Sequence, residues 1–276
     1  MQKRLPFINI TLVFLCAYLL AGLLACAPSG TPRESDLAAS TEPATKVPPP
    51  SYLRVGITAN APPLIYKNGK RFDGLEADLA KKLARHLGKR VKFVDMDWDE
   101  LIPALEADKI DIIMSSMSIT KARQYRIAFS NPYLRSGQIL LVRLQEKARF
   151  ATGIYSLMNS NYRIGIIKDT TGDLFITSTI NGAKVKYFTD PADAVEALID
   201  KDIDVFVYDA PMICHFAAVN ENNKLSPILT LATEEYLAWG IRKDNVQLLE
   251  QANAFLGDLK ENQQLLPMIR ARIPFM

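Results

Sequence analysis

Arg123 is the residue whose chemistry and position together point most directly to a ligand. It comes shortly after the apolar run 110–114, which is typical of a strand buried on both faces. Ser118 or Thr120 can cap a helix that would carry Arg123 in its first turn. A guanidinium stays charged and pairs with a carboxylate through two hydrogen bonds, and α/β folds bind ligands where such strands end. The sequence therefore predicts that Arg123 binds an anionic group, against the alternative of a surface arginine.

Three further positions carry groups that could meet the same ligand. The stretch 169–172 (Asp-Thr-Thr-Gly) lies between a predicted strand and a predicted helix. Free N–H groups and hydroxyls at such a place bind anions, or they cap the helix and do nothing more. Asp209 follows another apolar run, and it is either a ligand group or the cap of a helix that begins near Pro211. Trp98 precedes a predicted helix, and it either stacks on a ligand or a cation or packs in the core.

The elements that must position these residues alternate between strands and helices from residue 52 onward. Leucines recur at every fourth position from Leu75 to Leu87, which predicts an amphipathic helix that ends at Gly88. The other predicted helices are 99–107, 172–180, 191–199 and 245–262, and the predicted strands are 53–57, 91–94, 110–114, 162–167, 185–188 and 204–208. This order predicts an α/β fold of two lobes, each with a mostly parallel sheet flanked by helices.

Two further strand-like runs, 138–143 and 236–241, are predicted to cross between the lobes as hinge strands. The first lobe would then comprise residues 51–141 and 236–276, and the second lobe residues 142–235. In this arrangement Arg123 belongs to the first lobe, and Thr171 and Asp209 belong to the second. A ligand that touches both lobes would favour their closure.

The N-terminal segment reads as a targeting signal followed by a tether. Lys3 and Arg4 precede an apolar run over 7–24, and Cys26 stands where that run stops. The run is also long enough for an uncleaved membrane helix, which would equally place the domain outside the cytoplasm. Residues 26–50 are rich in Pro, Ser, Thr and Ala, and they predict an extended tether.

Composition excludes several classes of function. The formal charge is +3, and without Lys3 and Arg4 the basic residues number 31 against 30 acidic ones, so we expect no nucleic-acid partner. Beyond Cys16 in the predicted signal and Cys26, only Cys214 remains, so no disulfide is expected within the mature chain. The two histidines lie far apart, and no metal-ligand spacing or nucleophile–base pair is visible, so we expect no cofactor and no metal.

Four motifs occur in order at residues 74–80, 101–105, 111–123 and 129–133. Together they resemble bacterial extracellular solute-binding protein family 3, the receptors of polar amino-acid ABC transporters, over roughly residues 52–270. The resemblance implies a periplasmic binding protein of type II, a monomer that closes two lobes on a ligand and delivers it to an ABC permease. The segment that ends at Cys26 resembles a bacterial lipoprotein signal, which implies a lipid (palmitate-bearing) membrane anchor on that cysteine.

The resemblance also implies roles for individual residues. It places the carboxylate of an amino acid on Arg123, Thr170 and Thr171. It places the ligand ammonium on Asp209 and an apolar cleft residue at Trp98. The residues expected around the ligand are Arg123, Ser116, Ser118, Thr170, Thr171, Asp209 and Trp98.

The chain departs from the family pattern at three positions. Receptors for cationic amino acids carry an acidic residue that matches Thr58, an aromatic residue often matches Ala61, and a glycine usually matches Asp169. These departures leave the ligand open beyond its anionic group. They also keep two alternatives in view: an enzyme of the same fold such as cyclohexadienyl dehydratase, for which Glu76, Asp169 and Asp209 are available acids, or a ligand-sensing module for a signalling partner.

Overall fold

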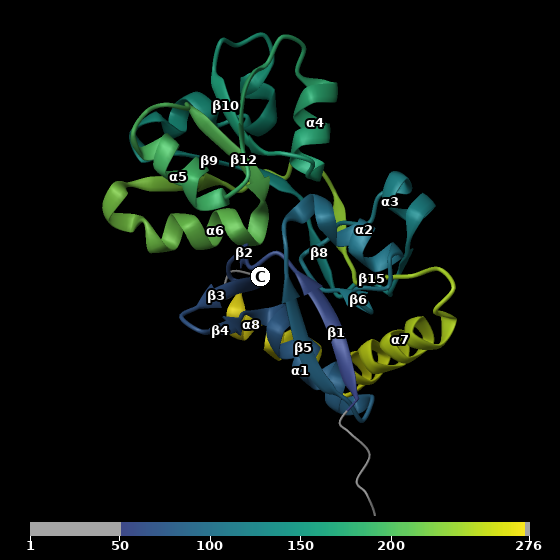
Figure 1. Cartoon of the computed structure of the whole chain (residues 1–276). Coiled ribbons are helices and arrows are strands. Elements are labelled where there is room, and N and C mark those ends of the chain that lie inside the picture. Colours follow the sequence, from purple (N-terminus) through teal and green to yellow (C-terminus); the bar gives the residue numbers. More distant parts are fainter. Residues whose placement is uncertain (1–50, 274–276) are drawn as a thin grey trace, which may run out of the picture. The chain divides into compact units, whose positions relative to one another are not determined.

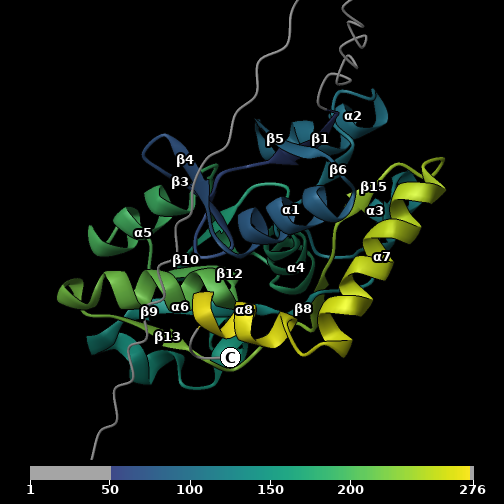
Figure 2. The same ribbon diagram turned by 90° about the horizontal axis from the view of Figure 1, so that it is seen from below.

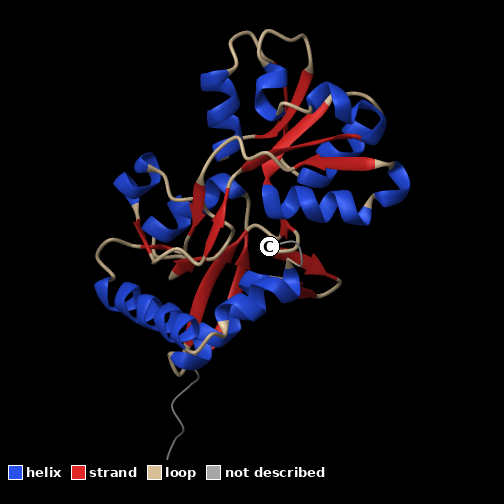
Figure 3. Cartoon of the chain, turned by 180° about the vertical axis from the view of Figure 1, so that it is seen from behind, coloured by secondary structure: helices blue, strands red, loops and turns tan. Residues whose placement is uncertain are grey.

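The computed structural model describes residues 51–273. The predicted signal, the lipidation site at Cys26 and the tether up to residue 50 lie outside the described residues. Within residues 51–273, no helix has both the length and the apolar character that a membrane crossing requires. Two five-stranded sheets, each with its own helices, form two lobes in this part of the chain (Figures 1 and 3). The predicted α/β architecture of two lobes is therefore confirmed.

The first lobe is built on a sheet with the strand order β5-β1-β6-β15-β7. β1 pairs in parallel with both β5 and β6, whereas β15 runs antiparallel to β6 and β7. The elements of this lobe are β1 (Tyr52–Ile57), β2 (Asn60–Ala61), β3 (Ile65–Asn68), β4 (Arg71–Asp73), α1 (Leu75–His86), β5 (Arg90–Asp95), the 3₁₀ helix η1 (Trp98–Glu100), α2 (Leu101–Glu106), β6 (Ile112–Ile113), α3 (Lys121–Arg126), β7 (Ala128–Phe129), β15 (Gly240–Ile241), α7 (Val246–Glu261) and α8 (Leu265–Arg272).

Side chains that alternate along β1 divide the core of the first lobe into two layers. Val55 and Ile57 are fully buried in the layer that contains α1, α7 and α8. Figure 2 shows these three helices side by side. Gly56 faces the opposite layer, where an added Cβ would clash with Ile110 beneath α2. The leucine period that predicted α1 is confirmed, because its buried stripe is the one that packs on β1.

The second lobe is built on a sheet with the strand order β11-β10-β12-β9-β13. β10 pairs in parallel with β11 and β12, and β9 runs antiparallel to β12 and β13. One face is covered by α4 and the 3₁₀ segments, the other by α5 and α6. The elements are β9 (Gln138–Arg143), η2 (Leu144–Phe150), η3 (Gly153–Leu157), β10 (Arg163–Ile167), α4 (Thr171–Thr179), β11 (Lys184–Phe188), α5 (Pro191–Ile199), β12 (Val205–Asp209), α6 (Ala210–Val219), η4 (Glu221–Asn223) and β13 (Leu225–Ile228).

The chain crosses between the two sheets at a short antiparallel pair, β8 (Leu134–Ser136) with β14 (Glu235–Leu237). The run 138–143 was predicted as one of these crossings, and that prediction was wrong. All six residues of β9 are buried, and they form an inner strand of the second sheet, between β12 and β13. Residues 138–141, predicted to lie in the first lobe, therefore pair in the second. The run 236–241 holds the return crossing in its first part, and its last residues form β15.

Candidate functional site

Arg123 lies in the first turn of α3, and its backbone N–H donates to the hydroxyl of the N-cap residue Thr120 at 3.2 Å. Its guanidinium donates to the Ser118 carbonyl at 2.9 Å, and its Cζ lies 5.1 Å from the centre of the Trp98 ring. Among the described residues, no carboxylate forms an ion pair or hydrogen bond with this guanidinium. Burial lowers the pKa of Arg123, Asp209 and Glu235 act in the opposite direction, and the group remains charged because its ordinary pKa is so high.

Ser116 and Ser118 belong to the loop that joins β6 to α3, and both are almost completely buried. Ser116 has a φ of 56°, in the left-handed region that non-glycine residues seldom occupy. Its backbone N–H and its hydroxyl both contact the carboxylate of Glu76, which is fully buried on α1. The predicted serines thus lie in the same loop as the predicted arginine.

The hydroxyls of the two threonines are already used inside the second lobe. Thr170 is the N-cap of α4: its hydroxyl accepts from the N–H of Asp173 at 3.3 Å and donates to the Ile167 carbonyl at 2.7 Å. The Thr171 hydroxyl donates to Glu235 at 2.7 Å. The first turn of α4 therefore offers a ligand its backbone N–H groups rather than these hydroxyl hydrogens.

Asp169 occupies the position where a glycine is usual, and its backbone explains the preference. Its φ of 59° is left-handed, a conformation that glycine adopts freely and aspartate tolerates. Its carbonyl accepts from Trp98 Nε1 at 3.0 Å and from the Arg123 guanidinium at 3.5 Å. Its side chain is more than half exposed and lies 4.0 Å from the Lys168 ammonium. Asp169 thus supplies a backbone carbonyl that contacts the first lobe, and its side-chain carboxylate lies near Lys168.

Asp209 ends β12 and is 6% exposed. Its side chain makes no hydrogen bond to the first turn of α6, so the capping alternative does not hold. Its carboxylate accepts from Gln138 Nε2 at 2.7 Å, and the same nitrogen contacts Glu235 at 3.1 Å and Thr171 at 3.2 Å. Burial raises the pKa of Asp209 to about 8, the charge of Glu235 adds to that rise, and Arg123 opposes it. The carboxyl groups of Asp209 and Glu235 and the guanidinium of Arg123 thus lie close enough to affect one another's charge.

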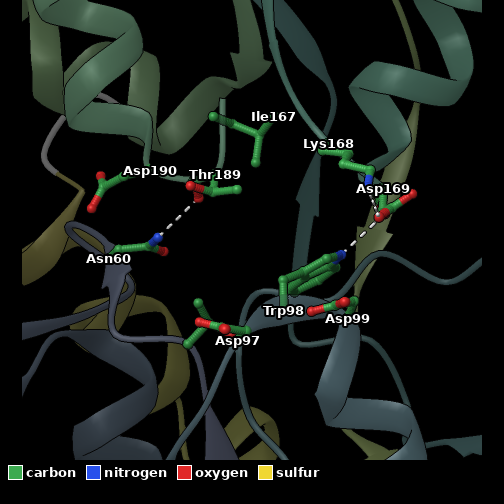
Figure 4. A pocket seen from close by; sticks show the side chains of 10 residues that line it. Asn60, Asp97, Trp98, Asp99, Ile167, Lys168, Asp169, Thr189 and Asp190 are labelled. Atoms are coloured by element: carbon green, nitrogen blue, oxygen red, sulfur yellow. Dashed lines mark hydrogen bonds and ion pairs between the residues drawn. The ribbon is translucent and has the colours of Figure 1, made fainter. Parts of the chain in front are cut away.

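All seven predicted ligand residues line one small cavity between the lobes, of about 20 Å³. Such a volume accommodates about one water molecule. The full lining is Trp98, Ser115, Ser116, Ser118, Arg123, Thr170, Thr171, Tyr208 and Asp209. A larger cavity of about 390 Å³ shares Trp98 with it and includes Thr58, Asn60, Asp97 and Asp190 in its lining (Figure 4). In Figure 4 the Trp98 indole points to the Asp169 carbonyl, and Asn60 reaches toward Thr189.

Three residues that support this site were not predicted as part of it: Gln138, Glu235 and, in its observed role, Glu76. Gln138 had one available signal. It is the polar residue at the head of an apolar strand, and antiparallel pairing of that strand with β12 sets it opposite Asp209. Glu235 is an acidic residue just before the return run, and it pairs with Ser136 across the crossing. Glu76 had been considered only as an acid available to an enzyme.

The other two departures from the family pattern have local roles. The Thr58 hydroxyl donates to the Met96 carbonyl at 3.0 Å, and its side chain also lines the larger cavity. Ala61 is 5% exposed in β2 and pairs with Ile65. Within residues 51–273, no group of three or more His, Cys, Asp or Glu side chains is placed to hold a metal ion.

Comparison with known proteins decides the family. The model of the bacterial extracellular solute-binding proteins, family 3, matches residues 53–270. This chain belongs to that family. A probable histidine-binding protein of Campylobacter jejuni is 30% identical over 209 residues, which are 75% of this chain and 77% of the relative.

Two further proteins similar to this family-3 protein are an enzyme and an amino acid-binding protein. Cyclohexadienyl dehydratase of Pseudomonas aeruginosa is 28% identical over 166 residues, 57% of this chain and 59% of the enzyme. The crystal structure of an ancestral amino acid-binding protein, a precursor of cyclohexadienyl dehydratase, superposes with a TM-score of 0.75 at 29% identity and covers 81% of this chain and 95% of its own. The two lobes therefore have the fold of type II periplasmic binding proteins, as the sequence predicted.

Proposed function

We propose that this family-3 protein is an extracytoplasmic receptor that binds an amino acid or a close analogue between its lobes and delivers it to an ABC importer. The observation that carries the proposal is that a guanidinium and a carboxyl group line one small cavity from opposite lobes. Arg123 enters it from the first lobe without a carboxylate partner among the described residues, and Asp209 enters it from the second. An α-amino acid carries the complementary carboxylate and ammonium on one carbon.

In this proposal each charged end of the ligand has its own partner. The ligand carboxylate pairs with the Arg123 fork and accepts from backbone N–H groups in the first turn of α4. The ammonium lies against Asp209. Ser116 and Ser118 supply polar contacts from the first lobe, and the Trp98 ring covers the remaining side. A zwitterion thereby neutralises both charges without any covalent step.

Closure of the lobes is the proposed response to binding. A cavity of about 20 Å³ is far smaller than an amino acid, so the lobes must separate to admit one and then close on it. A ligand that contacts Arg123 and Asp209 together stabilises the closed arrangement, because an open arrangement makes only one set of contacts. The bond between Trp98 and the Asp169 carbonyl is one contact that opening would break.

The proposed setting is a membrane surface. Cys26 would carry the lipid, the segment 26–50 would act as the tether, and an ABC permease would be the partner of a monomeric receptor. Mass spectrometry of the protein purified from a lipoprotein-processing bacterium would test the anchor directly. Cys26→Ser should release the protein from the membrane fraction.

A thermal-shift screen against amino acids, organic acids and short peptides tests the binding proposal. We expect one or a few amino acids to raise the melting temperature, because a ligand that binds only the folded state stabilises it by mass action. Arg123→Ala should abolish the shift. Arg126→Ala is the matched control, because Arg126 lies in the same helix but pairs with Glu106 at the surface. An unchanged shift in the Arg123 variant would show that the site is elsewhere.

A dehydratase is the second candidate, because a relative carries that activity and the described lobes contain buried acids. Asp209 lines the small cavity and burial raises its pKa to about 8, so it can carry a proton near neutrality. Incubation with prephenate or arogenate, followed by detection of the aromatic product, separates the two functions. Turnover that is lost in Asp209→Asn would replace the receptor proposal with the enzyme.

A further inference from the structure

Glu76 is a buried carboxylate that lines neither of the two cavities. It lies in the first turn of α1 and is fully inaccessible to solvent. One oxygen accepts from the backbone N–H of Ser116 at 2.6 Å and from the hydroxyl of Ser116 at 3.3 Å. The other oxygen accepts from the Tyr133 hydroxyl at 2.9 Å. Because all these partners are donors, an ionised carboxylate satisfies every one of them.

Ser116 needs such a partner because of its backbone. A left-handed φ is unfavourable for a serine, and it persists only where surrounding contacts hold it. The N–H bond to Glu76 is a charge-assisted contact at this same residue. Ser116 also lines the small cavity. Loss of the carboxylate would let the serine relax toward an ordinary conformation and change the surface that a ligand meets.

The loop that contains Ser116 is also joined to both crossings between the lobes. Tyr133, the second partner of Glu76, immediately precedes β8, donates its N–H to the Leu237 carbonyl at 3.0 Å, and stacks on Trp239 with ring centres 6.0 Å apart. The loop itself pairs with the return crossing, because Ala238 donates to the Met117 carbonyl at 3.1 Å and Ile119 donates to the Tyr236 carbonyl at 2.9 Å. Glu76 thus closes a polar link between the ligand loop and the first crossing.

We propose that Glu76 is a positioning residue of the ligand site, which holds Ser116 in its cavity-facing conformation and ties that loop to the crossing at Tyr133. This inference rests on the proposed function in one respect: the position of Ser116 matters to a ligand only if the cavity binds one. The contacts themselves are properties of the protein alone, and they can be tested without any ligand.

The charge of Glu76 provides the readout. Burial raises the pKa of Glu76 to about 7, while its hydrogen bonds oppose that rise. Tyr133 is the titratable group in contact with it, and burial together with the Glu76 and Asp209 charges raises the Tyr133 pKa well above its ordinary value. The phenol therefore remains a donor across the neutral range. Below pH 7 Glu76 gains a proton, and its contacts with Ser116 and Tyr133 must rearrange.

Nuclear magnetic resonance of the protein without added amino acids tests the proposal. In the wild type, the amide signals of Ser116 and Leu134 should titrate together with a midpoint near pH 7. Glu76→Gln keeps the shape of the side chain but removes the charge, so both titrations should vanish. Exchange of the Ser116 amide with solvent should be at least about tenfold faster in this variant at pH 8, the loss expected for one charge-assisted hydrogen bond.

Tyr133→Phe separates the two halves of the proposal. It should keep the titration at Ser116 and remove it at Leu134, because only the link to the crossing is cut. A Ser116 amide that exchanges no faster in Glu76→Gln, or a Ser116 titration that is equal in the wild type and in Glu76→Gln, would overturn the positioning role. A Leu134 titration that persists in Tyr133→Phe would overturn the link. Should a variant fail to fold, a wild-type Ser116 amide that exchanges with solvent as fast as an unprotected amide would also overturn the positioning role. A failed ligand screen bears only on the proposed function.

Discussion

The two lobes contribute to the candidate site in different ways. The first lobe presents side chains that are held mainly from within that lobe: Arg123 lies on a capped helix and Ser116 is bonded to Glu76. The second lobe presents backbone N–H groups and the Asp209 carboxylate, which accepts from Gln138. The same Gln138 nitrogen donates to Glu235 in β14, a strand of the crossing. One half presents a guanidinium and the other a carboxyl group.

This difference indicates which half senses closure. The cap of α3 and the Ser118 carbonyl hold Arg123 from within the first lobe, and among the described residues only its 3.5 Å bond to the Asp169 carbonyl crosses to the second. The first lobe can therefore hold a carboxylate whether the cleft is open or closed. The network around Asp209 includes Glu235 of β14, and β14 is one of the two strands that cross between the lobes. We therefore expect the ligand to bind first to the first lobe, and the network around Asp209 to change when the lobes close.

The largest expected effect is the loss of binding in Asp209→Asn. The amide keeps the size of the side chain but removes the charge that would face the ligand ammonium. Affinity for the amino acid found by the thermal-shift screen should fall by on the order of 100-fold, close to 3 kcal/mol. Calorimetric titration measures it, with the exposed Asp202→Asn as the control. Retained affinity would mean that the second lobe does not bind the ammonium.

The next effect is on stability, and its sign follows from the raised pKa values. Burial raises the pKa of Asp209 to about 8 and that of Glu76 to about 7, whereas both titrate near 4 in an unfolded chain. The folded protein therefore holds more protons between these limits, and its stability should fall as the pH rises from about 4 to about 8.

Urea unfolding across this pH range measures that slope. In Asp209→Asn the part of the slope between pH 7 and 8 should disappear, and in Glu76→Gln the part below pH 7 should shrink. The same slope in both variants and the wild type would show that neither carboxyl group keeps its proton in the folded state, which would remove the distinction between a neutral and a charged network.

The smallest effect concerns Glu235. Its charge raises the pKa of Asp209, so Glu235→Gln should lower that pKa and shift the pH profile of amino-acid binding toward lower pH. Affinity at pH 8 should change by less than about tenfold, because Asp209 remains. Glu234→Gln is the matched control, because Glu234 is the exposed neighbour of Glu235 and contacts Arg135 and Tyr236. An unshifted profile would separate Glu235 from the ligand site.

Much of this fold follows from patterns within single segments. The leucine period of α1 and the apolar runs of β1, β10 and β12 were predicted nearly to the residue, because burial of a face repeats along the chain. The strands β2, β3 and β4 were missed, since two to four residues are too short to show a period. β9 was found as a strand and assigned to the wrong place, because its pairing partners lie far away in sequence.

The residues of the candidate site also differ in whether their roles follow from the local sequence or depend on distant partners. Arg123, the serines and Asp209 could be predicted because each follows a strand end in an order typical of the family. Glu76 and Glu235 could not, because their roles depend on partners 40 to 97 positions away. Gln138 shows the limit most clearly. It begins a buried apolar strand, and the hydrogen bond from its amide to Asp209 can be recognised only once the pairing register of that strand is known.

The placement of the two tryptophans has an optical consequence. Trp239 is fully buried in the first lobe, whereas Trp98 lies half-buried at the cavity with its indole bonded to Asp169 and the Arg123 cation over its ring. If the lobes part as proposed, the surroundings of Trp98 should change more than those of Trp239. With excitation selective for tryptophan, we expect the intrinsic emission of the protein to report cleft opening without a dye.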